Sequence, residues 1–150
     1  MKISTLELRW RTRSGGGGRT ERRYLDFIVD GQSLQDRLEP RDHVTGLGCW
    51  VAEFEREYIQ QLLVRVTPES PTGRAPIYMC GECGDLGCGA ITAIVERSTV
   101  GFIWRDFVFE NNYDPAMTDL DAYRGVGPFL FNKTAYWQVL NERASALPAT

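Results

Sequence analysis

One segment constrains this chain more than any other, and it runs from Cys80 to Gly89 with the sequence Cys-Gly-Glu-Cys-Gly-Asp-Leu-Gly-Cys-Gly. It places three of the four cysteines within nine residues and interleaves them with four glycines. Packing alone does not require so many thiols in so short a turn. The segment therefore suggests a metal knuckle, a redox pair or a tightly constrained connection between strands.

The spacing of the first two cysteines favours zinc. Two residues between Cys80 and Cys83 let both thiolates reach one ion, and the glycine that follows lets backbone N–H groups turn toward sulfur. Cys88 is a third candidate ligand. A closed structural zinc site needs four ligands, and we expect Cys49 as the fourth, ahead of His43, the only histidine. The predicted cofactor is thus a structural zinc ion held by four cysteines.

Two other interpretations of the same segment stay open. Cys80 and Cys83 form a C-x-x-C pair, so a thiol-dependent redox enzyme is an alternative. Activated pairs usually precede a helix, whereas the glycine-rich residues after Cys83 do not favour one. The other alternative is a glycine-rich connection between two strands in which the thiols are small buried side chains.

Composition excludes several classes of protein. The chain has 150 residues, 43% hydrophobic and 25% charged, which is typical of one globular domain covering residues 1–150. A formal net charge of -3 argues against a strongly basic nucleic-acid binder. No segment approaches the ~20 apolar residues of a membrane span, and Met1–Trp10 alternates polar and apolar residues, unlike a signal peptide. We therefore expect a cytoplasmic protein, in which cysteines are normally reduced.

The hydrophobic periods predict an α+β fold. Alternating runs flank a glycine loop at residues 6–11 and 24–29, and two β-rich runs at 90–96 and 100–109 are joined closely enough for a central hairpin. Helical periods appear at residues 51–66 and after Asn132, a good N-cap. We predict an antiparallel sheet of about five or six strands packed by two amphipathic helices. The expected core includes Leu8, Trp10, Phe27, Phe54, Leu62, Ile94, Trp104, Phe107, Phe129, Tyr136 and Leu140.

Outside the cysteine segment, the sequence gives little sign of catalysis. It contains no nucleophile elbow, phosphate loop or H-E-x-x-H pattern, and a lone histidine in a polar loop is typical of a solvated side chain. The arginines at 9, 11 and 13 share one face of the first long strand, which we interpret as a solvated outer face. Acidic residues follow the second β-rich run, and a solvated loop is the simplest interpretation of them: Glu110, Asp114, Asp119 and Asp121.

Three motifs carry a resemblance to a family. They are the Cys-Gly-Asp-Leu-Gly-Cys-Gly turn at 83–89, Trp-Arg-Asp-Phe at 104–107, and Gly-Pro-Phe-Leu-Phe at 127–131 before the last helix. This pattern resembles a group of small bacterial proteins to which no activity is assigned. The resemblance covers most of the chain and implies no catalytic residues.

The leading functional prediction is a non-enzymatic binding protein with an unidentified protein partner. Its alternatives are the thiol-dependent enzyme and an immunity-type inhibitor of a toxin, whose acidic loop would face a basic partner such as a nuclease.

Overall fold

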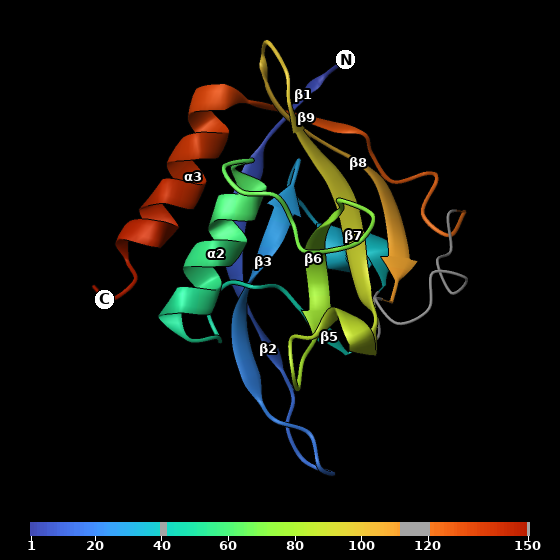
Figure 1. Cartoon of the computed structure of the whole chain (residues 1–150), viewed down its shortest axis with the longest axis vertical. Helices are drawn as coiled ribbons and strands as arrows, with labels where there is room; N and C mark the ends of the chain where they lie inside the picture. The colour runs from blue at the N-terminus through green and yellow to red at the C-terminus, as the bar shows by residue number, and fades with distance from the viewer. Residues whose placement is uncertain (40–41, 112–120, 150) are drawn as a thin grey trace.

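The computed structural model describes residues 1–39, 42–111 and 121–149, and it is a mixed α and β structure (Figure 1). The strands are β1 (Ile3–Ser4), β2 (Leu6–Arg13), β3 (Arg22–Val29), β4 (Gln32–Ser33), β5 (His43–Val44), β6 (Ala75–Cys80), β7 (Ala90–Arg97), β8 (Gly101–Glu110) and β9 (Phe129–Asn132). The helices are α1 (Leu34–Leu38), α2 (Ala52–Leu62) and α3 (Lys133–Ser145), with a short 3₁₀ turn at Leu86–Cys88.

The larger sheet has six strands in the order β1-β9-β8-β7-β6-β5. The β7/β8 pair lies at its centre and is antiparallel, which confirms the predicted central hairpin. The sequence predicted an antiparallel sheet, and this is wrong in one respect. The sheet is mixed, because β1 pairs with β9 in the parallel direction. β1 has only two residues, so its partner could not be inferred from a hydrophobic period.

A smaller sheet of three strands, β2-β3-β4, packs against the larger one. The predicted hairpin around the glycine loop forms its β2/β3 pair, in register from Leu6 opposite Val29 to Arg13 opposite Arg22. Phe27 of β3 is fully buried and lies edge-on against Tyr78 of β6 and Trp104 of β8. These aromatic contacts join the two sheets into one core.

Helices α2 and α3 lie side by side over this core (Figure 1). Asn132 caps α3 as expected, since its side chain accepts the backbone N–H of Ala135. Glu55 of α2, which is buried, and Arg143 of α3, which is partly exposed, form an ion pair with Nε and Oε2 2.5 Å apart. The structure has three helices in the described ranges rather than the two predicted, because the five residues of α1 are too few to show a period.

Most of the predicted core is buried, and the exceptions have local causes. Trp10 is 42% exposed, because the guanidinium groups of Arg23 and Arg143 rather than apolar side chains cover its ring. Ile94 is only partly buried, and it follows a β-bulge that shifts the register of β7 against β8 after Thr92. Leu8 and Phe54 pack against the core while keeping some exposure.

The acidic residues after β8 do not form one exposed group. Glu110 is buried at the end of β8, where its carboxylate accepts the hydroxyl groups of Ser70 and Thr72 at 3.0 Å. Asp114 and Asp119 lie outside the described residues. None of the helices in the described ranges has the length and apolar character needed to cross a bilayer.

Candidate functional site

Three of the four predicted ligands converge at the end of β6. The sulfur atoms of Cys80, Cys83 and Cys88 all lie within 4.8 Å of one another, and those of Cys83 and Cys88 are 3.1 Å apart. All are free thiols, and Cys83 and Cys88 are exposed. Sulfurs bound tetrahedrally to one zinc ion lie ~3.8 Å apart, which follows from a Zn–S distance of ~2.3 Å. These three residues, hereafter the thiol cluster, therefore need only small shifts to hold one ion.

Glycines and backbone hydrogen bonds give the cluster its shape. Cys80 ends β6, and its carbonyl accepts the backbone N–H of Gly84 at 3.0 Å. Gly84 has a φ of 66°, a left-handed conformation that side chains disfavour. This turn directs the backbone N–H of Asp85 toward the sulfur of Cys83, 3.4 Å away. The arrangement is the N–H to sulfur turn that the C-x-x-C-G spacing predicted.

The three thiols differ in acidity because their surroundings differ. Burial raises the pKa of the Cys80 thiol, but hydrogen bonds from the backbone N–H groups of Glu82 and Cys83 and from the neighbouring thiols outweigh it, so the pKa is lowered overall. The pKa of Cys88 is raised to about 12, and the largest cause is its hydrogen bond with Cys83. A cation bound by the cluster would favour deprotonation of all three thiols.

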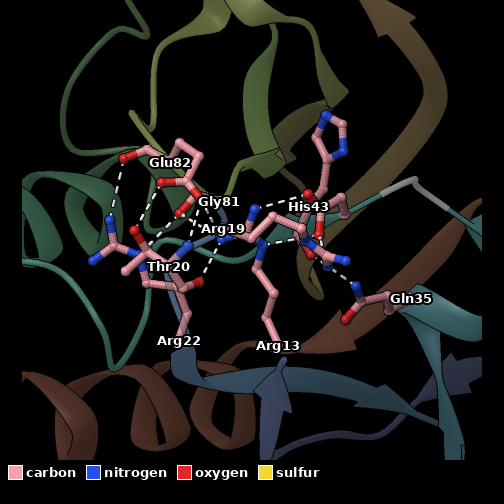
Figure 2. A network of polar contacts seen from close by, with 9 residues as sticks. Arg13, Arg19, Thr20, Arg22, Gln35, His43, Gly81 and Glu82 are labelled. Atoms are coloured by element: carbon pink, nitrogen blue, oxygen red, sulfur yellow. Dashed lines mark hydrogen bonds and ion pairs between the residues drawn. The ribbon is translucent and has the colours of Figure 1, made fainter. Parts of the chain in front are cut away.

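Two arginines of the smaller sheet hold the backbone of the turn (Figure 2). Arg22 donates from Nε to the carbonyl of Gly81 at 2.9 Å. Arg13, whose side chain is 4% exposed, donates to Glu82 Oε1 at 2.8 Å and to Asp42 Oδ2 at 2.7 Å. We call Arg13 and Arg22 the arginine clamp. It fixes residues 81–82, between the first two ligands, to a hairpin far away in the sequence.

Hydrogen bonds from Thr20 and Arg13 keep the Glu82 carboxyl group ionised. Hydrogen bonds from the backbone N–H of Thr20, from Arg13 and from the Thr20 hydroxyl lower the pKa of Glu82 to about 2. Its carboxylate is therefore ionised at neutral pH and turned toward β2 and β3 (Figure 2). These contacts occupy the carboxylate of Glu82, and it does not belong to the thiol cluster.

Cys49 is not part of the group of sulfurs within 4.8 Å. It is half-buried, and burial is the main cause that raises the pKa of its thiol to about 11. The positive charge of Arg22 acts on it, and Trp50, its neighbour in the sequence, lies under that guanidinium at 4.6 Å. The charge of Arg22 acts on Cys49, and the same side chain donates to the carbonyl of Gly81 in the turn. Cys49 as the fourth ligand stays a prediction about the metal-loaded protein.

His43 lies next to the cluster without belonging to it. β5 pairs with β6 so that His43 is opposite Cys80. Its Nε2 lies 3.0 Å from the carbonyl of Gly89, to which it donates, and its ring packs edge-on against Phe109. These contacts support the end of the turn and give His43 a positioning role there.

Sequence reasoning missed the arginine clamp. We interpreted the arginines of β2 as a solvated face, which is correct for Arg9 but wrong for Arg13, because Asp42 and the cysteine turn accept hydrogen bonds from its guanidinium at the end of β2. The alternation of arginines along β2 predicted that they share one face of the strand, but it could not predict which residues would cover that face.

No protein-family model, curated protein or solved structure matches this chain.

Proposed function

We propose that this protein binds one zinc ion through Cys80, Cys83 and Cys88 and acts as a metal-dependent binding protein rather than an enzyme. The observation that carries the proposal is the convergence of three sulfurs within 4.8 Å. Thiolates select soft or borderline ions, and zinc is the commonest of these for a knuckle of this spacing.

The fourth position of such a site faces outward. Cys83 and Cys88 are exposed, and the nearby carboxylate of Glu82 is held by Arg13 and Thr20. We propose that a water molecule or a donor from a partner protein completes the tetrahedron. The competing candidate is Cys49, which lies outside the group of sulfurs within 4.8 Å of one another.

Zinc affinity of the reduced protein tests this proposal, measured by competition with a chromophoric chelator. We expect one site per chain, and we expect Cys83→Ser and Cys88→Ser each to weaken binding by more than ~100-fold, because loss of even an outer-shell partner costs up to ~100-fold. Cys49→Ser is the matched control and should bind as the parent does. A comparable loss in Cys49→Ser would instead establish the closed four-cysteine site, and failure of the parent to bind zinc would refute the proposal.

One observation favours a second candidate function, thiol–disulfide exchange. The sulfurs of Cys83 and Cys88 are 3.1 Å apart and exposed, so a disulfide needs little movement. Two thiols would lose two protons and two electrons while a partner disulfide is reduced to two thiols. This pair differs from the Cys80/Cys83 pair expected from the sequence. We rank it second because the raised pKa of Cys88 keeps that thiol protonated at neutral pH.

A further inference from the structure

The three sulfurs of the thiol cluster are not equally placed for oxidation. Cys83 and Cys88 are exposed, whereas Cys80 is partly buried at the end of β6. The sulfurs of the exposed pair lie 3.1 Å apart, and a disulfide joins sulfurs at ~2.05 Å, so a shift of about 1 Å closes the bond. An oxidant in solution therefore reaches two thiols that already lie close to bonding distance, the arrangement of a reactive cysteine beside a resolving one.

The backbone on the two sides of Cys83 is held in different ways. Before it, the arginine clamp holds residues 81–82 (Figure 2). After it, the turn is closed by a contact of its own, in which the backbone N–H of Cys88 donates to the carbonyl of Asp85 at 3.1 Å. Cys88 can therefore move toward Cys83 together with this turn, while Cys80 stays in β6, where that strand pairs with β5.

Oxidation of the exposed pair removes two of the three zinc ligands. A cysteine bound to zinc is a thiolate, whereas a disulfide sulfur carries no such charge. Cys80 alone would remain, and zinc sites in proteins use three or four protein ligands. Loss of a single outer-shell partner already weakens metal binding by up to ~100-fold, so loss of two ligands should weaken it by more than ~1,000-fold.

We propose that the thiol cluster is a redox-controlled zinc site, in which a disulfide between Cys83 and Cys88 releases the ion and reduction of that disulfide restores the site. This inference rests on the proposed zinc binding and adds its regulation. The oxidant is a hydroperoxide, and the reductant is a thiol.

The oxidation balances with hydrogen peroxide. One thiolate attacks a peroxide oxygen, so that an S–O bond forms, the O–O bond breaks and hydroxide leaves. The other thiolate attacks the resulting sulfenic sulfur, which forms the S–S bond and releases a second hydroxide. The two sulfurs lose two electrons, which the peroxide gains, and two protons from solvent convert the hydroxides to water. Zinc leaves as Zn²⁺, without a change of oxidation state.

Zinc release from the loaded protein tests the proposal. Protein that carries one zinc ion per chain is treated with one equivalent of hydrogen peroxide, a chromophoric chelator reports the free ion, and mass spectrometry of unreduced peptides identifies the disulfide. We expect release of the ion together with a link between Cys83 and Cys88, and rebinding of zinc after dithiothreitol is added. Cys49→Ser is the matched control and should release and rebind zinc as the parent does.

Four results would each refute the switch while leaving zinc binding established. They are zinc that stays bound after peroxide treatment, a disulfide that includes Cys80 or Cys49, release that dithiothreitol does not reverse, and failure of Cys49→Ser to release its ion. A parent chain that binds no zinc would refute the proposed function and the switch together. Chelator competition on the oxidised protein gives a second measurement, since its zinc affinity should be at least ~1,000-fold below that of the reduced protein.

Discussion

The aromatic core around Trp104 and the thiol cluster are built in opposite ways. Trp104 is fully buried, with ring centroids 5.0 Å from Phe27 and 5.3 Å from Phe131, and its Nε1 donates to the hydroxyl of Tyr136 at 3.0 Å. The thiol cluster has two exposed members and is shaped by backbone N–H groups and by the arginine clamp. The core gains stability by excluding water, whereas the cluster places two of its three thiols at the surface.

The difference separates the residues that hold the fold from those that can act on a ligand. Buried aromatic side chains that satisfy one another leave nothing to offer a ligand. Exposed thiols brought within 4.8 Å gain little from one another in folding, so their arrangement points to a ligand. Changes in the core should therefore affect stability, and changes in the cluster should affect binding and reactivity.

The largest effect is expected in the core. Trp104→Asp should lower the free energy of unfolding by about 4 kcal/mol or more, because it leaves a cavity and buries a charge without a partner. Trp137→Asp is the matched control, since that tryptophan of α3 is 47% exposed, and it should cost about 1 kcal/mol or less. Urea denaturation followed by circular dichroism measures both. Equal stability of Trp104→Asp and the parent would contradict the account of the core.

Reactivity should distinguish two half-buried cysteines. The pKa of Cys80 is lowered below its ordinary value of 9.0, whereas that of Cys49 is raised to about 11. At pH 8 the thiolate fraction, and with it the rate of alkylation by iodoacetamide, should be at least ~100-fold greater at Cys80. The rate at Cys49 should then rise with pH up to about 11. Mass spectrometry of labelled peptides measures each site, and faster labelling of Cys49 would show that its environment is misassigned.

A smaller effect is expected from the arginine clamp. Arg13→Ala should cost about 2 kcal/mol at pH 7, since it removes charged hydrogen bonds to Asp42 and Glu82. Both carboxyl groups have a lowered pKa in the folded protein. Their contribution is therefore present above their unfolded pKa, near 4, and is lost as the pH falls toward about 2, the folded pKa of Glu82.

Unfolding experiments between pH 7 and pH 2 test this dependence. The parent should lose more stability than Arg13→Ala over the acidic part of that range. Arg9→Ala, an exposed arginine of the same strand, should follow the parent. Parallel pH curves for the parent and Arg13→Ala would mean that the clamp does not fix the turn.

Local periods in the sequence were sufficient for the long elements. The β-rich runs that became β7 and β8, the two longer helices and the β2/β3 hairpin each span enough residues to show a face. Strands β1 and β5 have two residues each and form only because a longer strand is beside them. Their pairing is a property of the assembled sheet, and so the mixed direction of the sheet was not predictable from the sequence.

The candidate site was also predictable only in part, and the predictable part is the local one. The three candidate ligands lie within nine residues of one another, so spacing alone brought Cys80, Cys83 and Cys88 together. The burial of Arg13 was not predictable, because arginine is normally exposed and its partners Asp42 and Glu82 lie 29 and 69 residues away.

Native mass spectrometry of the protein, purified in reducing buffer and supplied with zinc, tests the central claim most directly. The account predicts one zinc ion per chain and none on the variant in which Cys80, Cys83 and Cys88 are all replaced by serine. The Cys49→Ser variant should retain its ion. A parent chain that stays free of metal in excess zinc, or a triple variant that still carries the ion, would contradict the assignment of the thiol cluster as a metal site.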